Sequence, residues 1–360
     1  MELQEGEQFM KRYSKMFLST LFLSAALVFM YGSASYVRAA FQDAEEEEYS
    51  EEYEEQYNAL EAANKETDPV KSAGLLIEFI QKYPDSKLVP YAESSYQNLF
   101  ARCSQEKKFQ ELETIAEQWK KIKPGDKLAT ALIANAAEAL GHDEKYVQSM
   151  EEIYKQDPKV EYASALAQTY RKMKNDAKYI EWIEIVLKAP EYESNFRLRY
   201  ELMNEYISKK NNAKTMEYAQ ATLKAADLVK DTSADTVKDL TLVRLNVNRI
   251  IGSMLFDDGK FADAITSFQK ALKAEKYAEG YYWIGMCLWK QNNVDNAILA
   301  FAKAQLYGEK GSAADKEIAG KAKDRMEQLY KALHNNTTVG IEKQYRKAQE
   351  LADDDLAKPL

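Results

Sequence analysis

The chain has 360 residues, and 46% of them are hydrophobic, so it can bury a large core. With only 7 prolines and 13 glycines among many good helix formers, the composition favours an all-α fold. The net charge is −9, and no dense cluster of basic residues interrupts the sequence. Because a surface of that sign repels phosphate backbones, nucleic acid is not expected as a partner.

The start of the chain has the composition of an export signal. Residues 17–31 read FLSTLFLSAALVFMY without a charge, basic residues precede them, and small residues follow. This order is typical of a signal peptide. Extended to Val37, the apolar stretch also reaches the length of a membrane-spanning helix. Residues 1–40 are therefore predicted to be a signal peptide or an N-terminal membrane anchor, and the sequence leaves open which of the two.

Both interpretations place the rest of the chain outside the cytoplasm, because the positively charged flank stays inside. The expected location is the periplasm, free or anchored to the inner membrane. The sequence leaves open whether translation starts at Met1 or Met10. No cysteine follows the apolar stretch, so a lipid anchor is not expected.

An acidic run follows, which reads DAEEEEYSEEYEEQY over residues 43–57. Like charge at this density resists compact packing. A calcium site would need oxygen ligands on a tight turn with glycine, and the run has no glycine. We interpret residues 41–52 as an acidic linker, with the folded part beginning near Tyr53.

Prolines then interrupt the helical periodicity at regular places. Pro84, Pro124, Pro158 and Pro190 follow one another at similar intervals along the chain. Such a period indicates an array in which each unit is a pair of helices. Proline ends the second helix of each pair because it cannot continue the hydrogen-bond ladder. A cluster of Gly, Asn and Asp near the middle of the units marks the turn between the two helices.

Two stretches of the chain repeat one another closely. GKFADAITSFQKAL at 259–272 returns as NNVDNAILAFAKAQ at 292–305. Within each copy, small residues flank a phenylalanine at helical spacing, and a glycine in the preceding helix allows close approach of its partner. A single hairpin cannot bury its second face, so the next hairpin must cover it. The residues predicted to pack the repeats are Gly252, Ala264, Phe268, Ala271, Gly285, Ala297, Phe301 and Ala304.

These offsets resemble the tetratricopeptide repeat, whose signature places Gly, Ala, an aromatic residue and Ala at fixed offsets within one repeat. The match is good for the two units at 245–309. The earlier units keep the spacing but replace several small residues; they lie near 53–84, 89–124, 127–158, 160–191 and 196–227. LLIEFIQKYPDSKLVPYAE is also similar to the first repeats of periplasmic envelope-assembly members of the family.

The resemblance implies a right-handed superhelical α-solenoid of about seven helix pairs. Residues 53–227 are expected to hold the degenerate repeats, and residues 228–309 to hold one long helix (233–256) and the two well-matched repeats. Residues 310–360 are expected to form a C-terminal capping helix (313–334) and a tail that adds one more helix.

Few residues suit chemistry. His142 and His334 have no second ligand at metal-binding spacing, so both are interpreted as surface histidines. Cys103 and Cys287 belong to distant repeats, too far apart for a disulfide, and are interpreted as core residues. No phosphate-binding loop, nucleophile elbow or zinc motif is present. We therefore expect no catalytic residue, metal or cofactor.

What remains is a binding surface, because the family resemblance implies that first helices line a concave groove. Mixed aromatic, amide and cationic side chains off the packing stripe suit a peptide. The alternative that Tyr282 and Trp289 pack on neighbouring helices stays open. The candidate groove residues are Asn246, Arg249, Phe256, Tyr282, Met286, Trp289, Lys290, Arg171, Tyr200 and Asn204, with Ser253, Gln168 and Arg197 beside them.

The sequence thus favours a non-catalytic scaffold or adaptor outside the cytoplasm that holds a segment of another protein, in cell-envelope assembly by the family resemblance. One alternative is a membrane-anchored structural component that self-associates. A more distant one is an enzyme acting on cell-wall glycans through an acid and a base carboxylate. The sequence does not determine the partner, the binding face or the oligomeric state.

Overall fold

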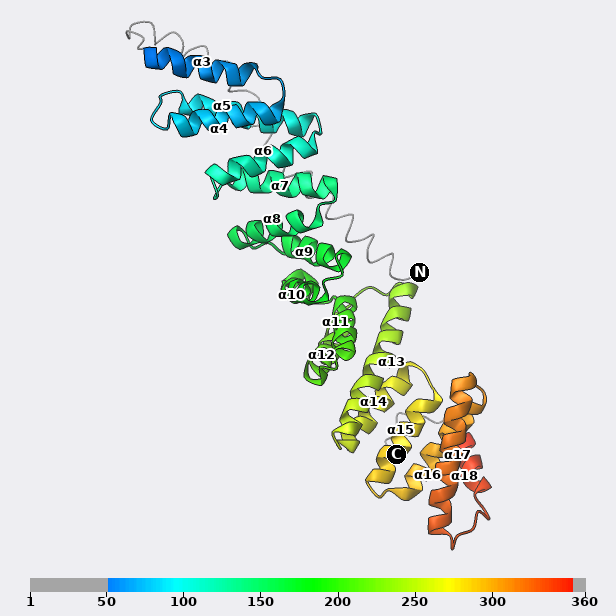
Figure 1. The fold of residues 1–360 in the computed structure, drawn as a ribbon. Helices are drawn as coiled ribbons and strands as arrows, with labels where there is room; N and C mark the ends of the chain where they lie inside the picture. Colours follow the sequence, from blue (N-terminus) through cyan, green and yellow to red (C-terminus); the bar gives the residue numbers. More distant parts are fainter. Residues whose placement is uncertain (1–50, 352–360) are drawn as a thin grey trace. The chain divides into compact units, whose positions relative to one another are not determined.

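The computed structural model describes residues 51–351, and within this range all regular structure is helical (Figure 1). The chain divides into two compact units, at Val186 and Leu187, and each is described separately below. Three predicted segments lie wholly or partly outside the described residues. They are the signal peptide or anchor, most of the acidic linker and the end of the tail. The expected all-α array of helix pairs is confirmed.

The first unit, described from Glu51 onward, contains four helical hairpins. The odd-numbered helix opens each pair, and prolines follow closely after α4, α6 and α8, as the spacing predicted. Buried side chains such as Leu76, Tyr96 and Trp119 join neighbouring hairpins in a continuous core. The helices are α3 (Glu51–Lys65), α4 (Pro69–Lys82), α5 (Val89–Gln105), α6 (Phe109–Ile122), α7 (Lys127–Leu140), α8 (Asp143–Gln156), α9 (Val160–Lys172) and α10 (Asp176–Val186).

The second unit, described as far as Leu351, contains three hairpins and two closing helices. A short 3-10 turn, η1 (Pro190–Tyr192), precedes them, so the fourth proline follows α10 at a greater distance than the other three follow their helices. The helices are α11 (Phe196–Ser208), α12 (Asn212–Asp227), α13 (Ala234–Asp257), α14 (Phe261–Ala274), α15 (Ala278–Lys290), α16 (Val294–Glu309), α17 (Ala313–Leu333) and α18 (Glu342–Glu350).

The turns inside the hairpins from α5 to α16 share one backbone feature, a residue with positive φ, which the turn between α3 and α4 lacks. Gly141 and Gly259 adopt it at 74° and 75°, and Asn292 at 62°. In three other hairpins the residue is a lysine, at Lys107, Lys174 and Lys210, with φ of 55–56°. The turn geometry is therefore kept even where the residue carries a side chain that disfavours it.

The two well-matched repeats pack a ring directly on a glycine. A Cβ atom built on Gly252 would lie 2.8 Å from the ring of Phe268, and one on Gly285 would lie 2.8 Å from the ring of Phe301. Both rings are buried, as are the alanines on either side of each. The structure places all eight predicted packing residues in the core, which leaves the other faces of these helices for different roles.

Candidate functional site

The predicted groove residues of the second unit lie on the first helices of successive hairpins, and several of them join one helix to the next. Asn246 of α13 donates a hydrogen bond to the hydroxyl of Tyr200 of α11, at 3.3 Å. Arg249 of α13 forms an ion pair with Glu279 of α15. These contacts define a row of side chains, hereafter the first-helix row, that runs across α11, α13 and α15.

Aromatic side chains continue the first-helix row. Phe256 of α13 packs edge-on against Trp283 of α15, with ring centroids 5.1 Å apart. Tyr282 contacts the rings of Trp283 and Phe301. The guanidinium of Arg325, from α17, lies 5.3 Å from the ring centroid of Trp289. Tyr282 and Trp289 therefore do pack on neighbouring helices, but each keeps part of its side chain at the surface.

None of the ten candidate groove residues is buried: Asn204, Lys290 and Arg171 are exposed, and the others are half-buried. Arg171 differs from the rest because it belongs to the first unit. There its guanidinium donates a hydrogen bond to the hydroxyl of Tyr179, at 3.3 Å. The structure thus brings nine of the ten predicted residues into one unit, on α11, α13 and α15.

Both histidines lie at helix ends. The imidazole of His142 contacts the carboxylate of Glu113 at 3.1 Å, and Lys145 contacts the same carboxylate at 3.1 Å. Glu113 itself is only 1% exposed, so Lys145 supplies the opposite charge for this buried carboxyl group and the imidazole adds a polar contact. His334 stacks on Tyr330 with ring centroids 3.9 Å apart. Neither histidine belongs to a group of side chains that could hold a metal ion within the described residues.

The cysteines are buried, each on the first helix of its hairpin, and both are free thiols. Burial raises the pKa of the Cys287 thiol to about 12, and it also raises the pKa of Cys103. A thiol that stays protonated is a poor nucleophile and a poor metal ligand. Their surroundings agree with a packing role.

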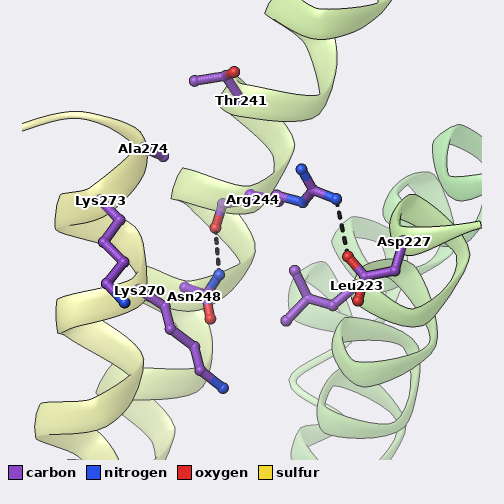
Figure 2. A pocket seen from close by; sticks show the side chains of 8 residues that line it. All are labelled: Leu223, Asp227, Thr241, Arg244, Asn248, Lys270, Lys273 and Ala274. Atoms are coloured by element: carbon purple, nitrogen blue, oxygen red, sulfur yellow. Dashed lines mark hydrogen bonds and ion pairs between the residues drawn. The ribbon is translucent and has the colours of Figure 1, made fainter. Parts of the chain in front are cut away.

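The structure also contains an open groove that was not predicted, with a volume of about 540 Å³ (Figure 2). It lies in the second unit between α12, α13 and α14, and we call it the basic groove. Arg244 projects from α13 toward Asp227, while Lys270 extends away from α14 and Lys273 runs along that helix. The lining residues are Leu223, Asp227, Thr241, Arg244, Asn248, Lys270, Lys273 and Ala274.

A weak signal for the basic groove exists in the sequence. Thr241, Arg244 and Asn248 follow the helical spacing i, i+3, i+7 on the long helix and form a polar stripe. Because an α-helix turns by about 100° per residue, this stripe lies roughly 140° around the helix axis from the stripe that carries Asn246 and Arg249. The stripe could have been noticed, but its neighbours on α12 and α14 could not be known from the sequence alone.

None of the helices within residues 51–351 combines the length and the apolar character needed to cross a membrane.

The hairpin architecture defines a helical-repeat protein. Residues 251–314 match the family model of the tetratricopeptide repeat. This part of the second unit thus carries tetratricopeptide repeats, and the fold supports a protein-interaction scaffold. Among curated proteins, none matches the sequence.

Solved structures that are similar to this chain include tetratricopeptide repeat proteins. The C-terminal part of a TPR repeat-containing protein from Cytophaga hutchinsonii shares 13% identity, covering 72% of this chain and 95% of the other, with a TM-score of 0.37. A tetratricopeptide repeat protein from Parabacteroides merdae shares 17% identity over 76% of this chain and 100% of the other, with a TM-score of 0.27. The TPR2AB domain of yeast Sti1, in complex with pHSP90, shares 16% identity over 60% of this chain and 95% of the other, with a TM-score of 0.22.

Proposed function

We propose that the protein is a non-catalytic scaffold that binds a segment of another protein along the first-helix row of its second unit. The observation that carries this proposal is the difference in burial between two sets of residues on α13 and α15. The signature glycines of these helices, Gly252 and Gly285, are buried against the next helix, whereas the candidate residues Arg249, Phe256, Tyr282, Met286 and Trp289 remain half-buried. The packing therefore leaves a preformed surface that costs little ordering when a partner binds.

The chemistry of the first-helix row suits a peptide. Phe256, Tyr282 and Trp289 offer flat apolar area, and their contacts with neighbouring helices restrict their rotamers. Arg249 and Asn246 offer hydrogen-bond donors to peptide carbonyl groups. Aromatic and arginine side chains of this kind carry most of the binding energy at protein interfaces.

We further propose that the protein acts outside the cytoplasm, in the periplasm or anchored to the inner membrane, in cell-envelope assembly. This part of the proposal is supported by residues 17–31, with their basic flank and small-residue exit, and by the similarity of residues 75–93 to periplasmic members of the family. Fractionation of cells that express the full chain, with an antibody against the second unit, tests the location.

Affinity capture with the tagged full chain tests the binding surface. The variant Arg249→Ala, Tyr282→Ala, Trp289→Ala should lose the partners that the natural chain recovers. A matched control removes exposed or half-exposed side chains of the first unit, with Tyr57→Ala, Arg102→Ala and Lys121→Ala, and should retain them. If both variants recover the same partners, the assignment of the first-helix row is wrong.

A further inference from the structure

The basic groove is not a general property of these repeats, because the next repeat closes the corresponding place. In the register that aligns Gly252 with Gly285, Arg244 corresponds to Tyr277 and Asn248 to Tyr281. Tyr281 is 1% exposed, and the hydroxyl of Tyr277 is buried as well. The space between α12 and α14 is therefore open, whereas aromatic side chains fill the corresponding space between α14 and α16.

The lysines show the same contrast. Lys270 corresponds to Lys303, which is only 4% exposed and lies 5.7 Å from the ring centroid of Tyr281. Lys273 corresponds to Leu306, which is buried. In the basic groove both Lys270 and Lys273 are exposed. One repeat thus uses these positions for its core, and the other presents them to solvent.

The difference originates in the length of α13. The equivalent of α15 (Ala278–Lys290) in the preceding repeat is residues 245–257, so residues 234–244 extend the helix at its N-terminus. Thr241 and Arg244 belong to this extension. Arg244 anchors it to the end of α12, where its guanidinium donates to the carbonyl oxygen of Ala226 at 3.3 Å and pairs with Asp227 at 2.9 Å. A cation is favourable at that helix C-terminus.

The charge of the groove is unbalanced. Arg244 is compensated by Asp227, the one acidic lining residue. Lys270 and Lys273 form no ion pair with any residue of the described part of the chain. Leu223 and Ala274 supply apolar surface beside these charges. Val237, one turn before Thr241 on the same face of α13, is 48% exposed and continues the apolar surface.

From these observations we propose that the basic groove is a second binding surface, which docks a peptide segment of a partner protein that carries carboxylates next to apolar side chains. Two uncompensated lysines suit such a segment by charge complementarity. The groove has the volume of a small-molecule or peptide side-chain site, and Leu223 and Ala274 give it an apolar part that a free inorganic anion would not use. An overall charge of −9 disfavours a nucleic acid in the same place.

The test measures the fluorescence anisotropy of a labelled short peptide of alternating glutamate and leucine, titrated with the full chain. Binding should weaken as salt is added, because the groove charges are exposed. Lys270→Glu with Lys273→Glu should weaken the affinity about tenfold, and Lys270→Gln with Lys273→Gln should weaken it less. The matched control is Lys316→Glu with Lys323→Glu on α17, two exposed lysines of the same unit, which should leave the affinity unchanged.

Four results would overturn the proposal. The first would be that the glutamine analogue of the peptide binds as tightly as the glutamate peptide. The second would be that the α17 control loses as much affinity as the groove variant. The third would be that a single-stranded oligonucleotide displaces the peptide and that its binding depends on the same two lysines. The fourth would be that replacing Glu45 to Glu48 by glutamine strengthens peptide binding, because the chain's own acidic run would then be the occupant of the groove.

The two binding proposals fail separately. The variant Arg249→Ala, Tyr282→Ala, Trp289→Ala changes the other stripe of α13 and two residues of α15, so it should bind the acidic peptide normally. The groove variant should still recover partners of the first-helix row.

Discussion

Adding one methyl group to Gly285 should destabilise the protein, although alanine is the better helix former. The added Cβ would lie 2.8 Å from Cε1 and 2.9 Å from Cδ1 of Phe301, well inside the distance of a normal carbon contact. Phe301 is fully buried, so its ring has no open space to enter. Overpacking of this kind costs about 1–3 kcal/mol, and the gain in helix propensity returns about 1 kcal/mol. The expected net loss in the free energy of unfolding is therefore about 0–2 kcal/mol.

Gly320 on α17 provides the matched control. A Cβ built there meets no atom within 4 Å, so Gly320→Ala should stabilise the protein by about 1 kcal/mol through helix propensity alone. The two substitutions are chemically identical and should act with opposite sign. Urea denaturation followed by far-UV circular dichroism compares the midpoints, which avoids a two-state assumption for a repeat protein.

A double substitution checks the cause of the loss. Phe301→Leu shortens the ring that the new methyl group would meet, so Gly285→Ala should cost less in that background than in the natural chain. A coupling of at least about 0.5 kcal/mol is expected for residues in direct contact. If Gly285→Ala stabilises the protein, or if the coupling is absent, the close glycine–ring contact does not limit the packing of these repeats.

Three further predictions concern single groups. The hydroxyl of Tyr96 donates to the carbonyl oxygen of Ile115 at 2.7 Å in the core, so Tyr96→Phe should lower the free energy of unfolding by about 1 kcal/mol in urea denaturation, and the half-buried Tyr91→Phe should not. Hydrogen bonds from the Thr236 hydroxyl and then from Ser233 hold the pKa of Asp231 below its ordinary 3.8. Their contribution is present above that pH and lost as the pH falls through the folded pKa, so hydrogen exchange at the start of α13 should accelerate in acid, and Asp231→Asn should remove this pH dependence. Burial raises the pKa of Cys287 from 9.0 to about 12, so this thiol should resist a thiol reagent in the native chain and react after unfolding, and its contribution to stability should fall as the pH rises above 9. Rapid labelling of Cys287 in the native chain would contradict that burial.

The sequence by itself determined the helical hairpins and their order. Helix length, turn position and hairpin boundary depend on local preferences, which a single chain displays in its periodicity and in its prolines. For that reason the predicted units near 53–84 to 196–227, the long helix at 233–256 and the capping helix at 313–334 agree closely with the helices observed. The spacing also predicted small residues beside Phe268 and Phe301 and a close helix approach at Gly252 and Gly285, and the structure adds that each ring rests on the glycine of its own hairpin.

Only the tertiary structure decided what each polar position does. Lys270 and Lys303 occupy the same position in two copies of one repeat, yet the first is exposed in a groove and the second is buried beside Tyr281. The difference depends on the helices that cover them, and those contacts join α12, α13 and α14 over the whole stretch from Leu223 to Ala274. Local preference cannot encode such a contact, because burial is a property of the neighbours in space rather than of the residue itself.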